Sequence, residues 1–266
     1  VGSTIGLCPP KVYLDDGGTY LSNTLQSEGW KFWTKKFWPE ALSMAKGKAD
    51  REVTAIVNGD LIDGNHHATT QIWSGSVFDQ INVAVECLTV WRNKVKHFFV
   101  VRGTPAHVGG AGGADETIAR ELGSSRPPKV STYSHYHLNL TLAGVNFNIA
   151  HHGPNPGTRT WLYGNSLRQY TRNMVLDAAL RGEEWPHVVI RSHVHKRTWE
   201  TIREHGHTCE GIITPAWQWK TEYGNMIASY EEIADVGGVI IDVDGGEVSS
   251  VKFLLLSLPQ STRATV

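Results

Sequence analysis

Polar clusters follow four separate apolar runs of strand length, and this pattern constrains the fold more than any other feature. The runs VTAIVN, HFFVV, NFNIA and HVVI lead within a few residues into GDLID, GTPAH, HHG and SHVH. In open α/β sheets, ligands bind at the carboxyl ends of the strands. The sequence therefore predicts an α/β protein in which four strand ends bring Asp and His side chains to one edge.

Helical segments separate these runs. Apolar residues recur at helical spacing over 28–48 and 77–95, and further helices are expected near Asp115 and over 166–181. The segment 136–153 and the C-terminal third alternate in the manner of hairpins. Because no repeat, low-complexity tract or linker interrupts the series, we expect a single domain over 1–266.

Charge and cysteine content restrict the classes of function. The formal net charge is -1, so no overall electrostatic case for nucleic acid or membrane binding exists. The apolar runs are too short to span a bilayer, so no membrane partner is expected. The three cysteines are odd in number and far apart, which indicates a reducing, cytoplasmic compartment without a disulfide framework.

Three His-x-His pairs stand out among thirteen histidines. The pair at 135 and 137 begins a strand and the pair at 205 and 207 flanks a hairpin turn, so both are interpreted as structural or surface groups. His193 and His195 instead follow a buried run directly. On an extended chain, residues i and i+2 lie on the same side about 7 Å apart. Such a strand end can give one imidazole to each of two neighbouring metal ions.

Asp60 is the natural bridge between two cations, because a carboxylate offers two oxygens and negative charge. Its structural alternative is a cap on the following turn. Asp63 is interpreted as a residue that supports the metal ligands without binding the metal, or as a turn former. Of the adjacent histidines before Gly153, His152 is the preferred ligand and His151 the fallback.

The order of these motifs resembles the calcineurin-like metallophosphoesterase superfamily, whose members carry D-x-H, G-D-x-x-D, G-N-H-[D/E], H-G and G-H-x-H at strand ends. Residues 59–63 match the second motif and residues 152–153 the fourth. Residues 192–195 match the fifth, with serine in place of glycine. The resemblance implies a four-layer α/β/β/α sandwich with two mixed β-sheets flanked by helices. GTPAHVG and TPAWQWKTEYG also resemble phage- or prophage-encoded members.

Two motifs depart from the family. Val1-Gly2-Ser3 fits the tail of D-x-H-x-G-S, so we expect the first strand and two metal ligands to precede Val1. In the third motif, Thr104 to His107 replace the Asn-His pair, and His107 is the expected catalytic imidazole. Residues 64–67 spell GNHH but share a loop with Asp60, so they are not this motif. Asn65, Thr104, a water or His107 are the rival replacements for the missing amide.

The resemblance implies hydrolysis of a phosphate mono- or diester by a hydroxide activated between two divalent metal ions. Asp60 bridges them, His152 and His193 hold one ion, and His195 helps to hold the other. His107 protonates the leaving group or steadies the phosphate. Mixed imidazole and carboxylate ligands suit Mn, Fe, Zn or Ni equally. A chain truncated before Val1 is expected to hold one ion poorly and to turn over slowly, in the cytoplasm of a bacterium or phage-infected cell.

Two other functions compete with this one. The altered third motif and absent first motif also fit a catalytically impaired metallophosphoesterase-fold binding protein. A nuclease is suggested by interleaved aromatic and basic residues, since such residues stack on bases and contact phosphates. These residues are Trp30, Trp33, Trp38, Lys31, Lys35 and Lys36, and the helical period turns the aromatics inward instead. Trp217 and Trp219, by contrast, could line a substrate cleft, although core packing is favoured there too.

Overall fold

The computed structural model describes residues 1–45, 52–66, 69–155, 162–204, 206–222 and 234–257. His67, His205 and the last residues of the helix expected over 28–48 lie outside these ranges.

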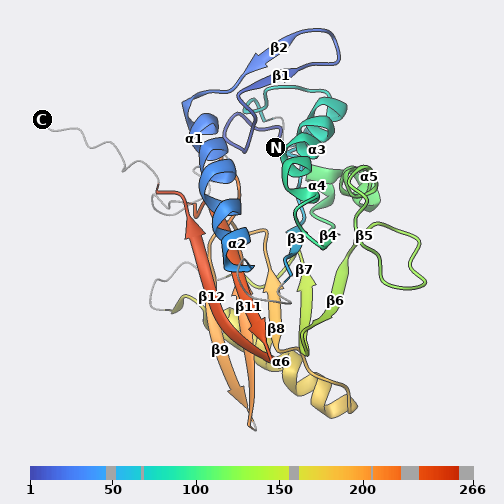
Figure 1. Cartoon of the computed structure of the whole chain (residues 1–266), viewed down its shortest axis with the longest axis vertical. Coiled ribbons are helices and arrows are strands. Elements are labelled where there is room, and N and C mark those ends of the chain that lie inside the picture. Colours follow the sequence, from blue (N-terminus) through green and yellow to red (C-terminus); the bar gives the residue numbers. More distant parts are fainter. Residues whose placement is uncertain (46–51, 67–68, 156–161, 205, 223–233, 258–266) are drawn as a thin grey trace, which may run out of the picture.

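Two β-sheets lie at the middle of the fold (Figure 1). The larger is mixed: its three central strands are parallel and both edge strands are antiparallel to their neighbours. In spatial order it contains β6 (His137–Leu142), β7 (Val145–Ala150), β8 (Val188–Arg191), β10 (His207–Ile213) and β9 (Thr198–Glu204). The smaller is parallel and contains β3 (Thr54–Asn58), β4 (His97–Val101) and β5 (Ser134–His135). The antiparallel hairpins are β1 (Lys11–Tyr13) with β2 (Thr19–Leu21), and β11 (Gly237–Asp244) with β12 (Glu247–Leu255).

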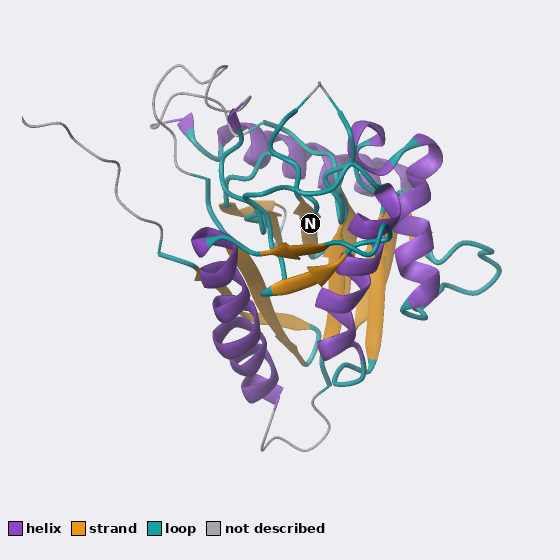
Figure 2. Cartoon of the chain, turned by 90° about the horizontal axis from the view of Figure 1, so that it is seen from above, coloured by secondary structure: helices purple, strands orange, loops and turns teal. Residues whose placement is uncertain are grey.

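Helices cover the strands on their outer sides (Figures 1 and 2). The first helical stretch begins earlier than expected because Asn23 and Gln26 form a reciprocal capping box, each side chain accepting the backbone N–H of the other residue. The longer helix predicted over 77–95 is shorter and ends at Arg92. The helices are α1 (Thr24–Phe32), the π-helical η1 (Trp33–Phe37), α2 (Trp38–Ala45), α3 (Val77–Arg92), α4 (Pro105–Val108), the 3-10 turn η2 (Gly110–Gly112), α5 (Gly113–Glu121) and α6 (Asn165–Arg181).

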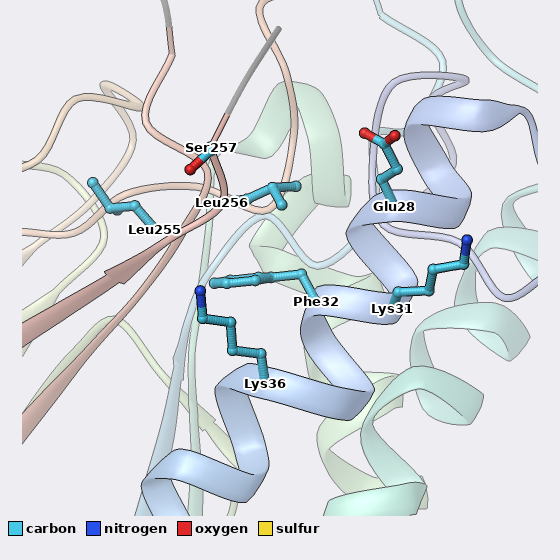
Figure 3. A pocket seen from close by; sticks show the side chains of 7 residues that line it. All are labelled: Glu28, Lys31, Phe32, Lys36, Leu255, Leu256 and Ser257. Atoms are coloured by element: carbon cyan, nitrogen blue, oxygen red, sulfur yellow. The ribbon is translucent and has the colours of Figure 1, made fainter.

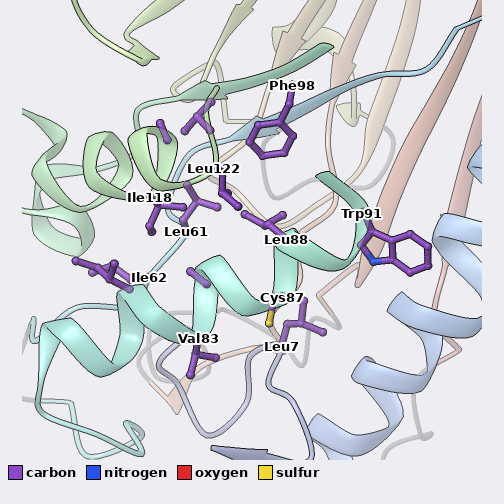
Figure 4. Close-up of a cluster of buried hydrophobic side chains, with 14 of the residues drawn as sticks. Leu7, Leu61, Ile62, Val83, Cys87, Leu88, Trp91, Phe98, Ile118 and Leu122 are labelled. Carbon is purple, nitrogen blue, oxygen red and sulfur yellow. The ribbon is translucent and has the colours of Figure 1, made fainter. Parts of the chain in front are cut away.

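Three apolar clusters hold four layers together. The first joins helices α3 and α5 to strands β3 and β4 and includes Leu88, Trp91, Phe98 and Ile118 (Figure 4). The second fills the space between the sheets, and the third packs α6 onto the larger sheet. The sequence-based prediction of an α/β/β/α arrangement is thereby confirmed, but only the larger sheet is mixed, because the described strands of the smaller sheet all pair in parallel.

The aromatic residues of the first helical stretch are part of the core. Trp33 and Trp38 are buried and meet edge to face, while Lys31, Lys35 and Lys36 are exposed on the other side. Trp217 packs on Trp33 with 4.5 Å between ring centroids. The inward orientation predicted from the helical period is confirmed for Trp33 and Trp38. Within the described ranges, every helix is too short or too polar to cross a bilayer.

Candidate metal centre

The ends of strands β3, β7 and β8 are tied together by one side chain. Asn58, the last residue of β3, donates through Nδ2 to the carbonyl of Ala150 at 3.1 Å and to the hydroxyl of Ser192 at 2.7 Å. Because β4 is parallel to β3, the loop after β4 starts at the same edge. Four separate loops therefore begin within a short distance of one another.

Asp60, in the loop after β3, lies at the centre of these loops. Its Oδ2 is 2.9 Å from Nε2 of His151 and 3.9 Å from Nδ1 of His193. One ligand atom from each of these three residues lies within 4.8 Å of the others. Thr104 orients the carboxylate, with its N–H 2.5 Å from Oδ1 and its hydroxyl 3.2 Å from Oδ2.

The protonation of His151 determines what this arrangement can hold. Its Nδ1 lies 2.6 Å from the carbonyl oxygen of Asn58, which can only accept, so Nδ1 carries the hydrogen. In the neutral ring, Nε2 then carries the lone pair; in the protonated ring, Nε2 donates to Oδ2 of Asp60, 2.9 Å away. A lone pair that faces a carboxylate oxygen needs a cation between them, either a proton or a metal ion. A carbonyl behind the distal nitrogen is the usual support of a metal-bound histidine.

The pKa values at this site follow from burial and mutual charge. Burial would raise the pKa of the Asp60 carboxyl, but its hydrogen bonds with His151 and His193 hold it well below the ordinary value. Burial opposes the charge on His151, yet contact with Asp60 leaves its pKa raised. Burial lowers the pKa of His195 to about 4 despite the Asp60 carboxylate. An ionised carboxylate and neutral imidazoles are the forms that bind metals.

Three of the predicted site residues have strained backbones. Asp60, His193 and His195 have φ angles of 53°, 73° and 54°, in the left-handed region that non-glycine residues rarely adopt. Such conformations cost about 1–3 kcal/mol each and gather at functional sites. The premise that His193 and His195 lie on an extended chain is therefore wrong. Both lie beyond the end of β8, where the chain bends.

A second group of ligand-type side chains adjoins the first. Asp63, His66 and His107 each place one ligand atom within 4.8 Å of the other two. Nε2 of His107 is 4.0 Å from Oδ2 of Asp60, so the two groups are neighbours. The sequence analysis met His66 only in the GNHH stretch at 64–67, which it set aside as the third motif, and no helix or strand period predicted that the loop after β3 returns His66 to Asp63.

The structure separates the remaining predicted site residues. His151, the fallback, contacts Asp60, whereas His152 is exposed with its ring centroid 4.7 Å from that of His193. Asn65 donates its side-chain amide to the carbonyl of Gly75 at 2.7 Å, so that amide is directed away from Asp60. His195 is half-buried. The ligand assignments of His152 and His195 stay predictions.

Asp115 supports the site from behind. This carboxylate, fully buried in the first turn of α5, accepts the backbone N–H of Gly103 at 2.7 Å and that of Leu61 at 3.3 Å. Burial raises its pKa to about 7, although the two amide hydrogen bonds act in the opposite direction. The Asp115 side chain joins the loops after β3 and β4 and thereby fixes Asp60 relative to Thr104. Sequence reasoning found Asp115 only as the start of a helix.

Gly103 allows the loops after β3 and β4 to touch. A Cβ at this position would overlap the backbone nitrogen and Oδ1 of Asp60 and lie 2.9 Å from its Cα. We expect Gly103→Ala to lower the free energy of unfolding by about 1–3 kcal/mol and to weaken metal binding, because the added methyl group must displace Asp60. Urea unfolding and metal titration measure both effects.

Gly75→Ala is the matched control, because a Cβ there meets no atom within 4 Å and the residue is not among the glycines with positive φ. If both variants bind metal as the wild type does, the close approach at Gly103 has no part in forming the site.

A groove elsewhere on the surface has no part in this centre. Residues of α1, η1 and the segment after β12 line it, including Phe32, Lys36 and Leu256 (Figure 3). None of the candidate ligands is among its lining residues.

Comparison with known proteins gives distant structural similarities only. No protein-family model and no curated protein matches the chain. The chain is similar to Vps29 complexed with Zn²⁺ from Entamoeba histolytica, at 14% identity over 77% of this chain and 98% of that one, with a TM-score of 0.37. A predicted phosphoesterase from Streptococcus pneumoniae is 15% identical over 78% of this chain and 100% of that one, with a TM-score of 0.35. Similarities of this size do not identify what this chain binds or does, and the family resemblance stays a prediction from the motifs.

Proposed function

We propose that this protein hydrolyses phosphate esters, mono- or diesters, with a divalent cation held by Asp60, His151 and His193. The observation that carries the proposal is the convergence of ligand atoms of Asp60, His151 and His193 within 4.8 Å of one another, with His151 Nε2 2.9 Å from Asp60 Oδ2 and its Nδ1 against the Asn58 carbonyl. When bound, a divalent cation lowers the pKa of water toward neutrality and offsets charge on phosphoryl oxygens. Imidazole and carboxylate ligands suit Mn, Fe, Zn or Ni.

The residues of the chain prepare the site before the substrate arrives. Thr104 directs both its donors at Asp60, which keeps the carboxylate from rotating toward solvent. Groups held by a second layer of hydrogen bonds need little reorganisation during reaction. Nδ1 of His151 lies 2.6 Å from the Asn58 carbonyl, and Nδ1 of His193 lies 3.1 Å from the Thr104 hydroxyl, so both rings are also held by the chain.

Access to the site is from the side of His152 and His193. The His193 side chain is 41% exposed, while that of His151 is 4% exposed. Burial and two neighbouring imidazoles lower the pKa of His152, so it is neutral near pH 7 and can donate a hydrogen bond. The role of His107 as a proton donor comes only from the motif resemblance.

Turnover of a chromogenic phosphodiester and a chromogenic phosphomonoester tests the proposal. We expect no turnover after dialysis against EDTA, and recovery on addition of Mn²⁺ or Zn²⁺, because the histidines and Asp60 alone supply no Lewis acid. The control variant is His137→Gln, which changes an exposed histidine on β6 and should keep full activity.

Turnover that survives EDTA would overturn the metal-dependent mechanism. Metal bound with no turnover of either ester would favour the alternative of a binding protein.

A further inference from the structure

Arginine and tyrosine side chains gather where α5 lies beside β5 (Figure 1). The guanidinium carbon of Arg102 lies 4.7 Å from the centroid of the Tyr136 ring, and that of Arg126 lies 4.4 Å from the centroid of the Tyr133 ring. Arg120 lies over the Tyr133 ring as well, at 5.1 Å. Tyr136 is 55% exposed, so much of its ring is open to solvent. These five residues are called the Arg-Tyr surface below.

One carboxylate organises the Arg-Tyr surface. Glu116, on α5, pairs with Arg120 at 2.9 Å and with Arg102 at 3.7 Å. It also accepts the Ser134 hydroxyl at 2.7 Å and the backbone N–H groups of Tyr133 and Ser134 at 3.1 and 2.9 Å. The arginines and the chain that carries the tyrosines are therefore held in place without a ligand.

The Arg-Tyr surface has an excess of positive charge. Glu116 is shared between two arginines, while Arg126 and the nearby Lys129 are exposed and form no ion pair among the described residues. Lys129 has a φ of 66° in an exposed turn, a conformation that non-glycine residues rarely adopt. Because the whole chain has a net charge of only -1, this excess is local, and a local excess of this sign attracts anionic ligands.

The Arg-Tyr surface begins next to the candidate metal centre. Arg102 is two residues before Thr104, and Thr104 donates its N–H to Asp60 at 2.5 Å. Two residues of chain span at most about 7 Å. A strand of phosphodiesters is a ligand that can contact this surface and present a phosphoester to Asp60 at the same time. Proteins that bind single strands without sequence preference combine cationic side chains for the phosphates with aromatic rings for the bases.

We propose that the Arg-Tyr surface binds single-stranded nucleic acid and that this strand is the substrate of the metal centre. The inference rests on the proposed function, for which it names the substrate class. Stacking on Tyr136 and neutralisation of phosphates do not need a 2′-hydroxyl, so DNA and RNA strands are one class of ligand here. The first helical stretch, which the sequence suggested for this role, instead buries Trp33 and Trp38.

Fluorescence anisotropy of labelled oligo-dT and oligo-U of about 15 nucleotides, measured in EDTA, tests binding apart from hydrolysis. We expect wild-type Kd values of about 100 μM or below at low salt. Tyr136→Ala should weaken binding at least about 5-fold, the factor expected for the loss of one stacked base, and Tyr136→Phe should match the wild type because it keeps the ring. Tyr13→Ala is the matched control, since Tyr13 is 74% exposed on β1 with the Lys11 ammonium over its ring.

The salt dependence of binding tests the arginines. In Arg126→Gln the slope of log affinity against log salt concentration should become shallower by about 0.7, because one fewer phosphate is neutralised. Arg172→Gln, which changes an arginine on α6 that pairs with Glu204, should keep the wild-type slope.

Cleavage with Mn²⁺ present links the surface to the metal centre. The wild type should cleave the strands, and Tyr136→Ala should raise the KM for a strand while hydrolysing a small chromogenic diester as the wild type does. Far-UV circular dichroism checks that each variant is folded.

Three results would overturn the inference: no binding of either strand, binding that Tyr136→Ala and Arg126→Gln leave unchanged, or displacement of the strand by an equal charge concentration of polyglutamate, which would indicate a surface for acidic proteins. If the small diester is hydrolysed while the strands are neither bound nor cleaved, the inference is wrong and the proposed function survives. If neither the strands nor the small diester is hydrolysed, the proposed function fails and the substrate assignment fails with it.

Discussion

Asp60→Asn is expected to abolish phosphoester turnover and to weaken metal binding at least ~100-fold, while the protein stays folded. Asparagine is neutral and offers one carbonyl oxygen where the carboxylate offers two. In one rotamer of the asparagine the NH₂ group replaces Oδ1 and faces the Thr104 N–H; in the other it replaces Oδ2 and faces the Thr104 hydroxyl and His151. Either way, a donor faces a donor, and part of the hydrogen bonding that orients Asp60 is lost. Isothermal titration with Mn²⁺ or Zn²⁺ and a chromogenic phosphodiester assay measure the two losses.

Asp177→Asn is the matched control for this change. Asp177 lies on the exposed face of α6 and forms a surface ion pair with Arg181, which contributes at most about 1 kcal/mol. It should bind metal and turn over substrate as the wild type does. Retention of wild-type activity by Asp60→Asn would refute the catalytic role of the carboxylate.

Asp115→Ala is expected to cause the largest loss of stability, about 2–5 kcal/mol. The substitution leaves the buried N–H groups of Leu61 and Gly103 without acceptors, and each unsatisfied group costs about 1–3 kcal/mol. Asp115→Asn keeps one acceptor oxygen and should lie between the wild type and Asp115→Ala. Urea unfolding of the EDTA-treated proteins ranks the three. A loss below about 0.5 kcal/mol in Asp115→Ala would mean that Asp115 does not hold the two loops together.

The stability difference between the wild type and Asp115→Asn should depend on pH. In the folded protein the Asp115 pKa is raised to about 7 from its ordinary value of 3.8. The folded state therefore binds the proton more tightly than the unfolded state does. The contribution of Asp115 protonation to the free energy of unfolding is fully present below pH 3.8. It is lost as the pH rises to about 7, at about 1.4 kcal/mol per pH unit. The wild type should thus lose stability relative to Asp115→Asn between pH 5 and about pH 7, and a flat or opposite trend would show that Asp115 is ionised throughout.

Periodicity in the sequence predicted the layers of the fold but not the ends of its elements. The buried strands β3, β4 and β8 and the apolar stripe of α3 follow from short β-branched runs and from helical spacing. The start of α1 could not be predicted from the apolar pattern, because it depends on the hydrogen bonds that Asn23 exchanges with Gln26. Element ends are set by such local capping contacts, which the apolar pattern does not record.

The candidate site was predictable where a side chain follows a strand directly. Asp60 and His193 were found in this way. The choice between His151 and His152 was not predictable, because neighbouring residues at a strand end point to opposite sides. Only the packed sheets show which side faces Asp60. His66 and Asp115 reach the site through loop and helix packing, and no spacing in the sequence encodes those contacts.

The most direct measurement is anomalous X-ray diffraction from a crystal of the protein soaked in Mn²⁺ or Zn²⁺. An anomalous peak is predicted about 2.0–2.2 Å from a carboxylate oxygen of Asp60, Nε2 of His151 and Nδ1 of His193. A crystal with no peak there, or with the metal bound only at surface histidines such as His137, would contradict the assignment of a metal centre at these strand ends.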